Sequence, residues 1–378
     1  MLSKIIVSIA LFCLVCQVKI LALDSRVIKL PLTDSIKFFD GLLFTVIGKF
    51  HTEKNYVRLP WEYKGKVRKE VWELSQNSAG ISIRFRTNAT DISVNWTAME
   101  ELSFPHMAAT VVRGVDLYAY VNGKWQFIQT GRPKGKSSEN LLLKDGEPVY
   151  REYLLNLPLY DGIEKLSIGI IFGAEISSPV EQLLVNKKPI VYYGSSIAQG
   201  ACASRPGMGF TNILSRKLDR AFINMGFSGE GTYDLSVAEA ICEVDAALYV
   251  IDCNPNTPIE FIHERAVKLV SFIRSKRPGI PILLVENFIK DNDYFMKDKI
   301  WNGAGKQKEL RNAFYNLKKS GIKDIYYQQG NGLIGNDHEG TVDGVHPNDV
   351  GMLRIADFIL PQIKTILDKK NHLTKPGF

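Results

Sequence analysis

The sequence predicts an α/β protein in which an antiparallel β-sandwich precedes an open, doubly wound parallel sheet. Two observations predict this class. Apolar and polar residues alternate with a period of two from about residue 42 to residue 172, and from Pro189 onward continuous apolar runs alternate with helical patterns. The 378 residues are 45% hydrophobic and 23% charged, a composition that excludes a disordered or collagen-like chain.

The first residues have the pattern of a secretory signal peptide. Lys4 supplies a positive charge, an apolar run follows from Ile5 to Val18, and Ala22 is a small residue at a suitable distance for cleavage. Because that run is too short to span a bilayer comfortably, we expect removal of residues 1–22 and a secreted or periplasmic protein. An uncleaved anchor is the alternative. No later segment is apolar enough to cross a membrane, so we expect no integral membrane segment in the mature chain.

Short alternating segments with turns between them predict the β-sandwich, which we assign to residues 23–180. Asn122-Gly123 is a tight-turn signal between two such segments and indicates a hairpin. The stretch Arg132–Asn140 is basic and polar, which indicates an exposed loop. The linker is expected at Glu175–Lys188. Strands are expected around Ile81–Phe85, Ile92–Trp96, Leu117–Val121, Lys124–Gln129, Glu152–Leu157 and Leu166–Phe172.

The second part, residues 181–378, contains apolar runs that suit strands buried on both faces of a parallel sheet. One helix face is formed by apolar residues between Ile259 and Ile273, another by those between Leu310 and Leu317, with Gly321 as its cap, and a last helix is expected at about Val350–Ile366. Ligands of such sheets bind at the carboxyl ends of the strands, so chemistry is expected in the loops after the runs. The four runs are Ile190–Tyr193, Ala221–Met225, Ala246–Ile251 and Pro281–Val285.

The loop after the first run offers a nucleophile. It contains Gly194, Ser195 and Ser196. A glycine allows a sharp turn, and the helix that follows directs its amide groups toward a serine placed there. An ordinary Gly-Ser-Ser loop is the alternative interpretation.

The loops after the second and third runs offer hydrogen-bond donors for an oxyanion. Gly226, Gly229 and Gly231 would bring backbone N–H groups close to a ligand, and Asn254 could add a side-chain amide. A phosphate-binding loop is disfavoured because the Gly-Lys-Ser/Thr ending is missing. Simple turn chemistry is the alternative for the Asn-Pro-Asn stretch.

Asp343 and His346 form the remaining catalytic pattern. A histidine that acts as a base needs a carboxylate on Nδ1, and an aspartate three residues earlier allows that contact within one tight loop. A chance surface loop is the alternative for this pair alone. Together, the loops predict a nucleophile, oxyanion donors and an Asp–His pair that converge at one edge of the sheet.

These four blocks resemble the SGNH (GDSL-type) hydrolase family, which is named for Ser, Gly, Asn and His. The resemblance implies Ser196 as nucleophile, His346 as base, Asp343 as its partner, and an oxyanion hole formed by Ser196, Gly229 and Asn254. It also implies a flavodoxin-like three-layer α/β/α fold of about five strands. Gly114–Tyr118 matches the G-x-D-L-Y signature of the β-rich, jelly-roll-like domain that precedes one bacterial group of these esterases, and Ala203–Met208 also resembles that group.

Some positions depart from the family pattern or stay open. Ser195 replaces the usual Asp of the first block and is a rival nucleophile, and Gly226 is an alternative donor to Gly229. Gln199 and Arg205 follow the nucleophile and are candidates for the substrate pocket, with a structural role as the alternative. A disulfide between Cys202 and Cys253 is a further expectation left open.

We therefore expect a secreted serine ester hydrolase, most specifically a carbohydrate O-acetyl esterase with an acylated carbohydrate as substrate. A lipase or general short-chain esterase, and an inactive glycan-binding protein, are the alternatives. The net charge of +7 is spread along the chain, which disfavours nucleic-acid binding. The mature chain has no zinc-ligand spacing, so neither a metal nor an organic cofactor is expected. The sequence does not define the oligomeric state.

Overall fold

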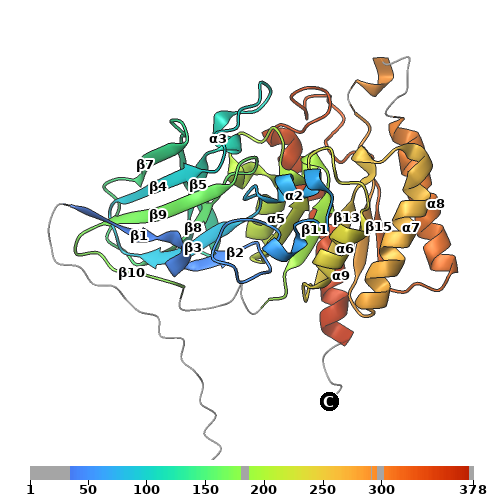
Figure 1. The fold of residues 1–378 in the computed structure, drawn as a ribbon, viewed down its shortest axis with the longest axis horizontal. Helices are drawn as coiled ribbons and strands as arrows, with labels where there is room; N and C mark the ends of the chain where they lie inside the picture. The colour runs from blue at the N-terminus through green and yellow to red at the C-terminus, as the bar shows by residue number, and fades with distance from the viewer. Residues whose placement is uncertain (1–34, 180–186, 291, 296–301, 374–378) are drawn as a thin grey trace, which may run out of the picture.

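A computed structural model describes residues 35–179, 187–290, 292–295 and 302–373 of the protein. The expected signal peptide lies outside these residues. Figure 1 shows a β-rich part beside an α/β part, with the two in contact along one side. In the described part of the chain, no helix has the length and apolarity that a membrane span requires.

The β-rich part consists of two antiparallel sheets that enclose a common apolar core, as the alternating pattern predicted. Residues such as Ile83, Val94 and Leu155 point between the sheets and are completely buried. The first sheet has the order β1 (Ile36–Asp40), β9 (Ile163–Ile171), β4 (Ile92–Ala98) and β7 (Ser137–Leu143). The second has the order β10 (Ile176–Ser177), β3 (Ser82–Thr87), β8 (Arg151–Asn156), β5 (Val115–Val121) and β6 (Lys124–Gly131), and β2 (Thr45–Ile47) pairs with β3.

The location of strand β7 differs from what the sequence predicted. The segment Arg132–Asn140 was predicted to be an exposed loop, but β7 begins inside it at Ser137 and pairs with β4. Only Ser138 and Leu142 of this edge strand are buried. Polar residues occupy both faces of its first half, Ser137 to Asn140, so the strand lacks the apolar alternation by which strands are recognised in a sequence.

The α/β part has a five-stranded parallel sheet in the order 2-1-3-4-5, which is the flavodoxin-like topology. The last strand was not predicted, because three of its four residues are only partly buried. The strands are β12 (Phe222–Gly226), β11 (Ile190–Gly194), β13 (Leu248–Asp252), β14 (Ile282–Val285) and β15 (Ile325–Gln328). The helices are α4 (Ser196–Gln199), α5 (Phe210–Leu218), α6 (Leu235–Cys242), α7 (Ile259–Lys276), α8 (Gly303–Lys319) and α9 (Asp349–Leu373).

Both faces of this sheet are covered by helices. Alternate residues of β11 enter different cores: Val191 and Tyr193 pack in the core of α6, α7 and α8, whereas Ile190 and Tyr192 pack in the core of α4, α5 and α9. This alternation explains why the strands appear as continuous apolar runs. The result is the predicted three-layer α/β/α sandwich.

The β-rich part shares both of these cores. Leu59 and Val71 belong to the core of α6–α8, and Val111 and Leu159 belong to the core on the opposite face. The β-rich part thus has its own core between its two sheets and also contributes residues to both cores of the α/β part. Helices α2 (Lys69–Ser75) and α3 (Ala109–Val112) lie in this contact region, and short 3-10 turns are found at Gly41–Leu43, Trp61–Tyr63, Pro206–Met208, Asn254–Asn256 and Asp293–Phe295.

Candidate active site

Ser196 is the first residue of α4, directly beyond the end of β11. A glycine is needed at position 194, where β11 lies close to β13, because a Cβ there would lie 2.8 Å from the carbonyl oxygen of Asp252. Ser195 caps the short helix: its Oγ accepts from the N–H of Ile197 at 3.3 Å, and its side chain is fully buried. The structure thus directs the Oγ of Ser196, rather than that of Ser195, into the site.

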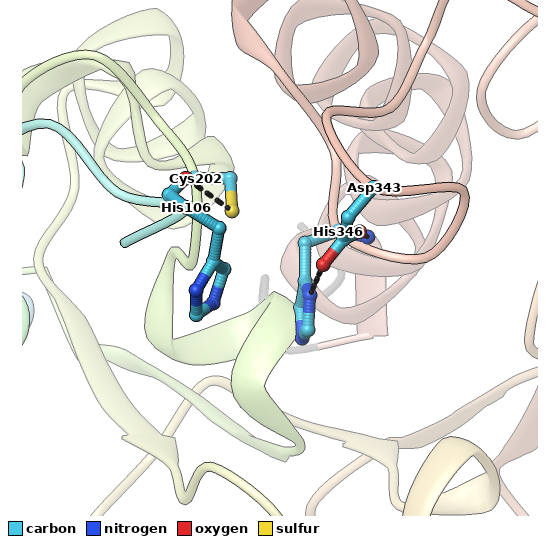
Figure 2. Close-up of side chains that lie close together, drawn as sticks. All are labelled: His106, Cys202, Asp343 and His346. Carbon is cyan, nitrogen blue, oxygen red and sulfur yellow. Dashed lines mark hydrogen bonds and ion pairs between the residues drawn. The ribbon is translucent and has the colours of Figure 1, made fainter. Parts of the chain in front are cut away.

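His346 lies in a tight loop just before α9, and Asp343 organises that loop. One carboxylate oxygen of Asp343, Oδ1, accepts from the backbone N–H groups of Val345 at 3.0 Å and His346 at 2.7 Å. The other, Oδ2, lies 2.8 Å from Nδ1 of His346 (Figure 2). The spacing of three residues therefore makes the contact that the sequence predicted.

The imidazole bridges the hydroxyl and the carboxylate. Nε2 of His346 lies 3.0 Å from Oγ of Ser196. Partial burial acts to raise the pKa of Asp343, but the hydrogen bonds from the ring and backbone of His346 hold that pKa below its ordinary value. An ionised carboxylate at Nδ1 fixes the tautomer in which Nε2 can accept a proton. The arrangement is chemically suited to nucleophilic attack by Ser196.

The backbone N–H groups of Ser196 and Gly229 are suited to binding an oxyanion. Gly229 has φ +75°, and a Cβ at this position would meet open space. Among the described residues, the N–H groups of Ser196 and Gly229 have no hydrogen-bond partner. In contrast, the N–H of Gly226 donates to Oδ1 of Asn224 at 2.8 Å, which occupies the donor of the alternative glycine.

The side chain of Asn254 is oriented differently from the expectation. It is fully buried, and its Nδ2 donates to Oδ1 of Asn287 and to the carbonyl of Lys306, both at 3.2 Å. Its Oδ1 accepts from the hydroxyl of Tyr233 at 2.8 Å, which fixes the orientation of the amide. Both amide protons are therefore occupied in this arrangement, and a bond to an oxyanion requires that one of them be released.

Gln199 does not line a pocket, contrary to the expectation. The side chain is fully buried. Its Nε2 donates to Oδ1 of Asn77 and to the carbonyl of Leu159, both at 3.0 Å, and its Oε1 accepts from the N–H of Ser228 at 3.0 Å. Gln199 thus ties α4 to the β-rich part and to the loop of Gly229, so its role is structural.

Arg205 also has a structural place, as part of a clamp formed by the G-x-D-L-Y signature. Asp116 of the signature is fully buried, and its Oδ2 accepts from Arg205 at 2.7 Å and from the N–H of Gly207 at 2.8 Å. The hydroxyl of Tyr118 accepts a second bond from Arg205 at 2.6 Å. The guanidinium also lies 3.8 Å from the ring centroid of Phe127. This expectation is corrected: Arg205 anchors the loop after Ser196 to the β-rich part.

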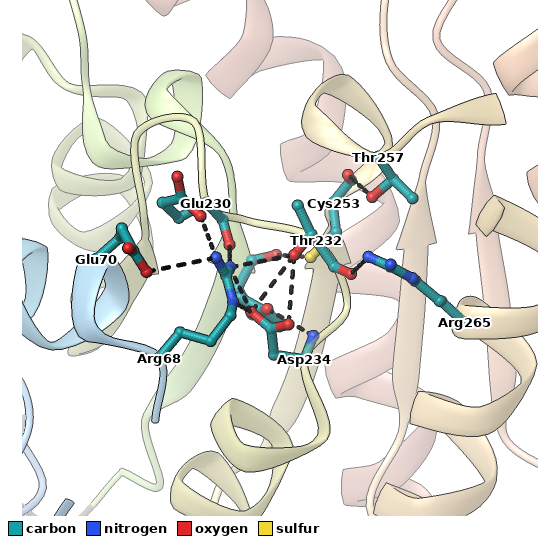
Figure 3. Close-up of polar contacts among 9 residues, drawn as sticks. Arg68, Glu70, Glu230, Thr232, Asp234, Cys253, Thr257 and Arg265 are labelled. Atoms are coloured by element: carbon teal, nitrogen blue, oxygen red, sulfur yellow. Dashed lines mark hydrogen bonds and ion pairs between the residues drawn. The ribbon is translucent and has the colours of Figure 1, made fainter. Parts of the chain in front are cut away.

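Two arginines that sequence analysis missed hold the loop of Gly229 and the end of β12, the strand that leads into it. Arg58 is buried, and its guanidinium donates to the carbonyls of Asn77, Asn224 and Gly226. Arg68 binds the loop from outside (Figure 3): it pairs with Glu230 and donates to Oδ2 of Asp234 at 2.8 Å. Neither arginine lies in a motif. In the contacts with Asn224, Gly226 and Asp234, the arginine and its partner are more than 160 residues apart in the sequence, so no local pattern could have indicated them.

The expected disulfide is not formed. Cys202, Cys242 and Cys253 are all free and buried. The thiol of Cys202 donates to the carbonyl of His106 at 3.4 Å, and that of Cys253 contacts the carbonyl of Tyr193 at 3.9 Å.

A cavity of about 780 Å³ adjoins the site on the side of the β-rich part. Tyr160, which lines it, donates from its hydroxyl to the carbonyl of Ser196 at 3.2 Å, and Ser228, which also lines it, precedes Gly229. Phe104 supplies a second aromatic wall. Four glutamates line the cavity: Glu70, Glu73, Glu100 and Glu230. None of the described residues that line it is Lys or Arg.

Comparisons with known proteins agree with this architecture. Residues 187–364 match the GDSL-like Lipase/Acylhydrolase family, and residues 36–176 match the N-terminus of SGNH-hydrolase-type esterases, called GxDLY. A protein from Bacteroides ovatus, described in its crystal structure as a GDSL-like lipase, is 35% identical with a TM-score of 0.84, over 88% of this chain and 98% of that one. No curated protein sequence matches the chain significantly.

More distant solved structures share the fold. A salicylyl-acyltransferase from a tetracycline biosynthetic pathway is 17% identical with a TM-score of 0.69, over 90% of this chain and 97% of that one. An acetyl xylan esterase from the rumen bacterium Butyrivibrio proteoclasticus is 9% identical with a TM-score of 0.53, over 91% and 99%.

Fold, site and comparisons together define a serine hydrolase that acts on ester bonds. The chain belongs to the GDSL-like lipase/acylhydrolase family, in the group whose catalytic part follows a GxDLY domain.

Proposed function

We propose that the protein is a secreted carbohydrate O-acetyl esterase. The observation that carries the catalytic part of this proposal is the hydrogen-bonded series from Ser196 through His346 to Asp343, with separations of 3.0 and 2.8 Å. Secretion is proposed from the pattern of residues 1–22.

The mechanism has two halves. Oγ of Ser196 attacks the ester carbonyl while Nε2 of His346 takes its proton, and the same proton then passes to the oxygen of the leaving alcohol. Water, activated by His346, attacks the acyl-enzyme and releases the carboxylic acid. Asp343 orients the ring and stabilises the imidazolium. The N–H groups of Ser196 and Gly229 bind the oxyanion, and we propose Asn254 as a third donor that exchanges one of its present partners.

The cavity beside the site supports a sugar as the leaving alcohol. Phe104 is partly exposed and offers aromatic surface against which a sugar ring can pack, and the glutamates offer acceptors for its hydroxyls. A lipase would need an extended apolar channel for its acyl chain, whereas charged residues line this cavity. The acetyl xylan esterase and the family-two carbohydrate esterases that share the fold act on or bind carbohydrates by their descriptions.

Substitution of the two adjacent serines tests the nucleophile. We expect Ser196→Ala to abolish hydrolysis of an aryl acetate, because the attacking oxygen is removed. Ser195→Ala is the matched control and should retain most of the activity, since Ser195 only caps α4. Comparable activity in Ser196→Ala and the wild type would reject the assignment.

Acetate release tests the substrate class. We expect acetate from acetylated plant polysaccharides, and a sharp fall in rate on aryl esters from acetyl to butyryl. A rate that rises with acyl chain length would favour the lipase alternative. A folded protein that reacts with no fluorophosphonate probe would instead favour the inactive glycan-binding alternative.

A further inference from the structure

A second set of reactive side chains lies against the catalytic relay. His106, Cys202, Asp343 and His346 each offer one ligand-type atom, and these four atoms all lie within 4.8 Å of one another. Figure 2 shows the rings of His106 and His346 facing each other across a gap, with the sulfur of Cys202 on one side and the carboxylate of Asp343 on the other. The two ring centroids are 5.7 Å apart.

The four residues come from three separate segments. His106 lies between β4 and α3 of the β-rich part, Cys202 follows α4, and the other two lie in the loop before α9. The three segments are held in place independently of any ligand. Thr110 binds the carbonyl of Ser204, and Ser204 in turn donates to Asp349 through its N–H at 2.8 Å and its hydroxyl at 2.6 Å. The cluster is therefore a consequence of the tertiary structure.

We propose that these four side chains form an inhibitory site for a thiophilic divalent cation, Zn²⁺ by preference, which withdraws His346 from Ser196 when it binds. Two imidazoles, a thiolate and a carboxylate are the ligands that zinc takes in tetrahedral sites. Magnesium and calcium prefer oxygen ligands alone, and this set offers them only one carboxylate.

The geometry requires a small contraction. With metal–ligand distances of about 2.0–2.3 Å, the ligand atoms of a tetrahedral zinc site are roughly 3.3–3.6 Å apart. The longest separation here is at most 4.8 Å, so some atoms must approach by about 1 Å. Rotation of the two imidazole rings can supply this movement, because both histidines are partly exposed.

Metal binding would stop the proposed reaction, and this consequence rests on the proposed function. A cation on Nε2 of His346 takes the lone pair that would accept the proton of Ser196. A cation on Nδ1 leaves the remaining ring proton on Nε2, with the same result. Burial and the charge of Asp343 raise the pKa of the Cys202 thiol to about 12, so the thiol loses its proton to solvent as the metal–sulfur bond forms.

Inhibition by zinc is the first test. We expect Zn²⁺ to inhibit hydrolysis of an aryl acetate and a chelator to restore the rate, whereas Mg²⁺ and Ca²⁺ have no effect. His106→Ala and Cys202→Ser should each raise the half-inhibitory Zn²⁺ concentration by at least about tenfold, because each removes a ligand. Cys242→Ser, which changes a buried thiol outside the cluster, is the matched control.

Binding of Co²⁺ gives a readout that does not depend on activity. Ser196→Ala retains all four ligands, so we expect it to bind Co²⁺ with a thiolate-to-cobalt absorption band that is lost in Cys202→Ser. If His106→Ala does not fold, His106→Gln is used in its place to remove this ligand. Unchanged zinc inhibition in both ligand variants, or no cobalt band in the wild type, overturns the metal site. Full activity of Ser196→Ala would instead overturn the proposed function and leave the cobalt result standing.

Discussion

Two adjacent serines differ in role because of one turn. Ser195 and Ser196 are equivalent in the sequence, yet the end of β11 directs one hydroxyl to a backbone amide and the other to His346. The same selection separates Gly226 from Gly229, since only the first has its N–H occupied by a neighbouring side chain. At this scale, function depends on which donors and acceptors the local fold leaves available.

Asp343→Asn tests the orientation of His346. We expect kcat to fall by up to about 10⁴-fold, because an amide at this position favours the wrong tautomer of the ring. Because the pKa of Asp343 is lowered in the folded protein, its ionised carboxylate stabilises the fold. This stabilisation is fully present above the pKa of the unfolded state and is lost as the pH falls through the pKa of the folded state. The difference in melting temperature between wild type and variant should therefore shrink below about pH 4. A constant difference at all pH values would contradict this.

Asn254→Ala separates a catalytic role from a structural one. If the amide serves as an oxyanion donor, kcat of the folded protein should fall by about 10²–10³-fold with little change in KM, which is the result we expect. A purely structural role would lower the melting temperature, because Tyr233 and Asn287 lose a buried partner, but would leave kcat of the folded fraction near the wild-type value. Circular dichroism and titration of active sites distinguish the two results.

Whole elements of the site are held by contacts from the β-rich part. The clamp of Asp116 on Arg205 and Gly207 fixes the segment after α4. Arg58 fixes the end of β12, and Arg68 fixes the segment that follows it. The loops that carry the chemistry thus have little regular structure of their own and depend on distant side chains for their positions.

Arg58→Met tests this dependence. The substitution leaves several buried carbonyls without their donor, so we expect a loss of at least about 2 kcal/mol in the free energy of unfolding. We also expect a lower kcat for the fraction that is folded, because the loop of Gly229 loses its support. Chemical denaturation measures the first effect. Arg132→Met, at an exposed position, is the control and should change neither quantity.

At the scale of the whole molecule, the two parts form one catalytic unit. Residues of the β-rich part complete both cores of the α/β part and line the cavity beside Ser196. An isolated α/β part would expose these apolar surfaces and would lack one wall of that cavity. The GxDLY part therefore shapes the active site as well as preceding it.

The charge of the cavity predicts a preference among substrates. Because glutamates line it, we expect acetylated neutral glycans to be hydrolysed faster than acetylated glycans rich in uronic acids. Glu100→Gln should reduce this preference by about two- to fivefold, and added salt should reduce it further. Glu164→Gln, on the exposed face of β9, is the matched control. Equal rates on both substrate classes, unaffected by Glu100→Gln, would contradict the prediction.

Local patterns in the sequence were sufficient for the class of fold and for the relay. Alternation predicted the sheets, apolar runs predicted four of the five parallel strands, and the spacing of Asp343 and His346 made their contact possible within one loop. The strands β7 and β15 were not predicted, because polar residues occupy both faces of the first half of β7 and three of the four residues of β15 are only partly buried.

Only the tertiary structure decided which polar groups meet across long separations in sequence. It placed Gln199 and Arg205 in structural networks, turned the amide of Asn254 toward Asn287, and brought His106 and Cys202 beside His346. The physical reason is that periodicity encodes the burial of apolar faces, which is local and repeats along the chain. A hydrogen bond or ligand cluster between distant segments leaves no such repeat, because it depends on the exact packing of all the elements between them.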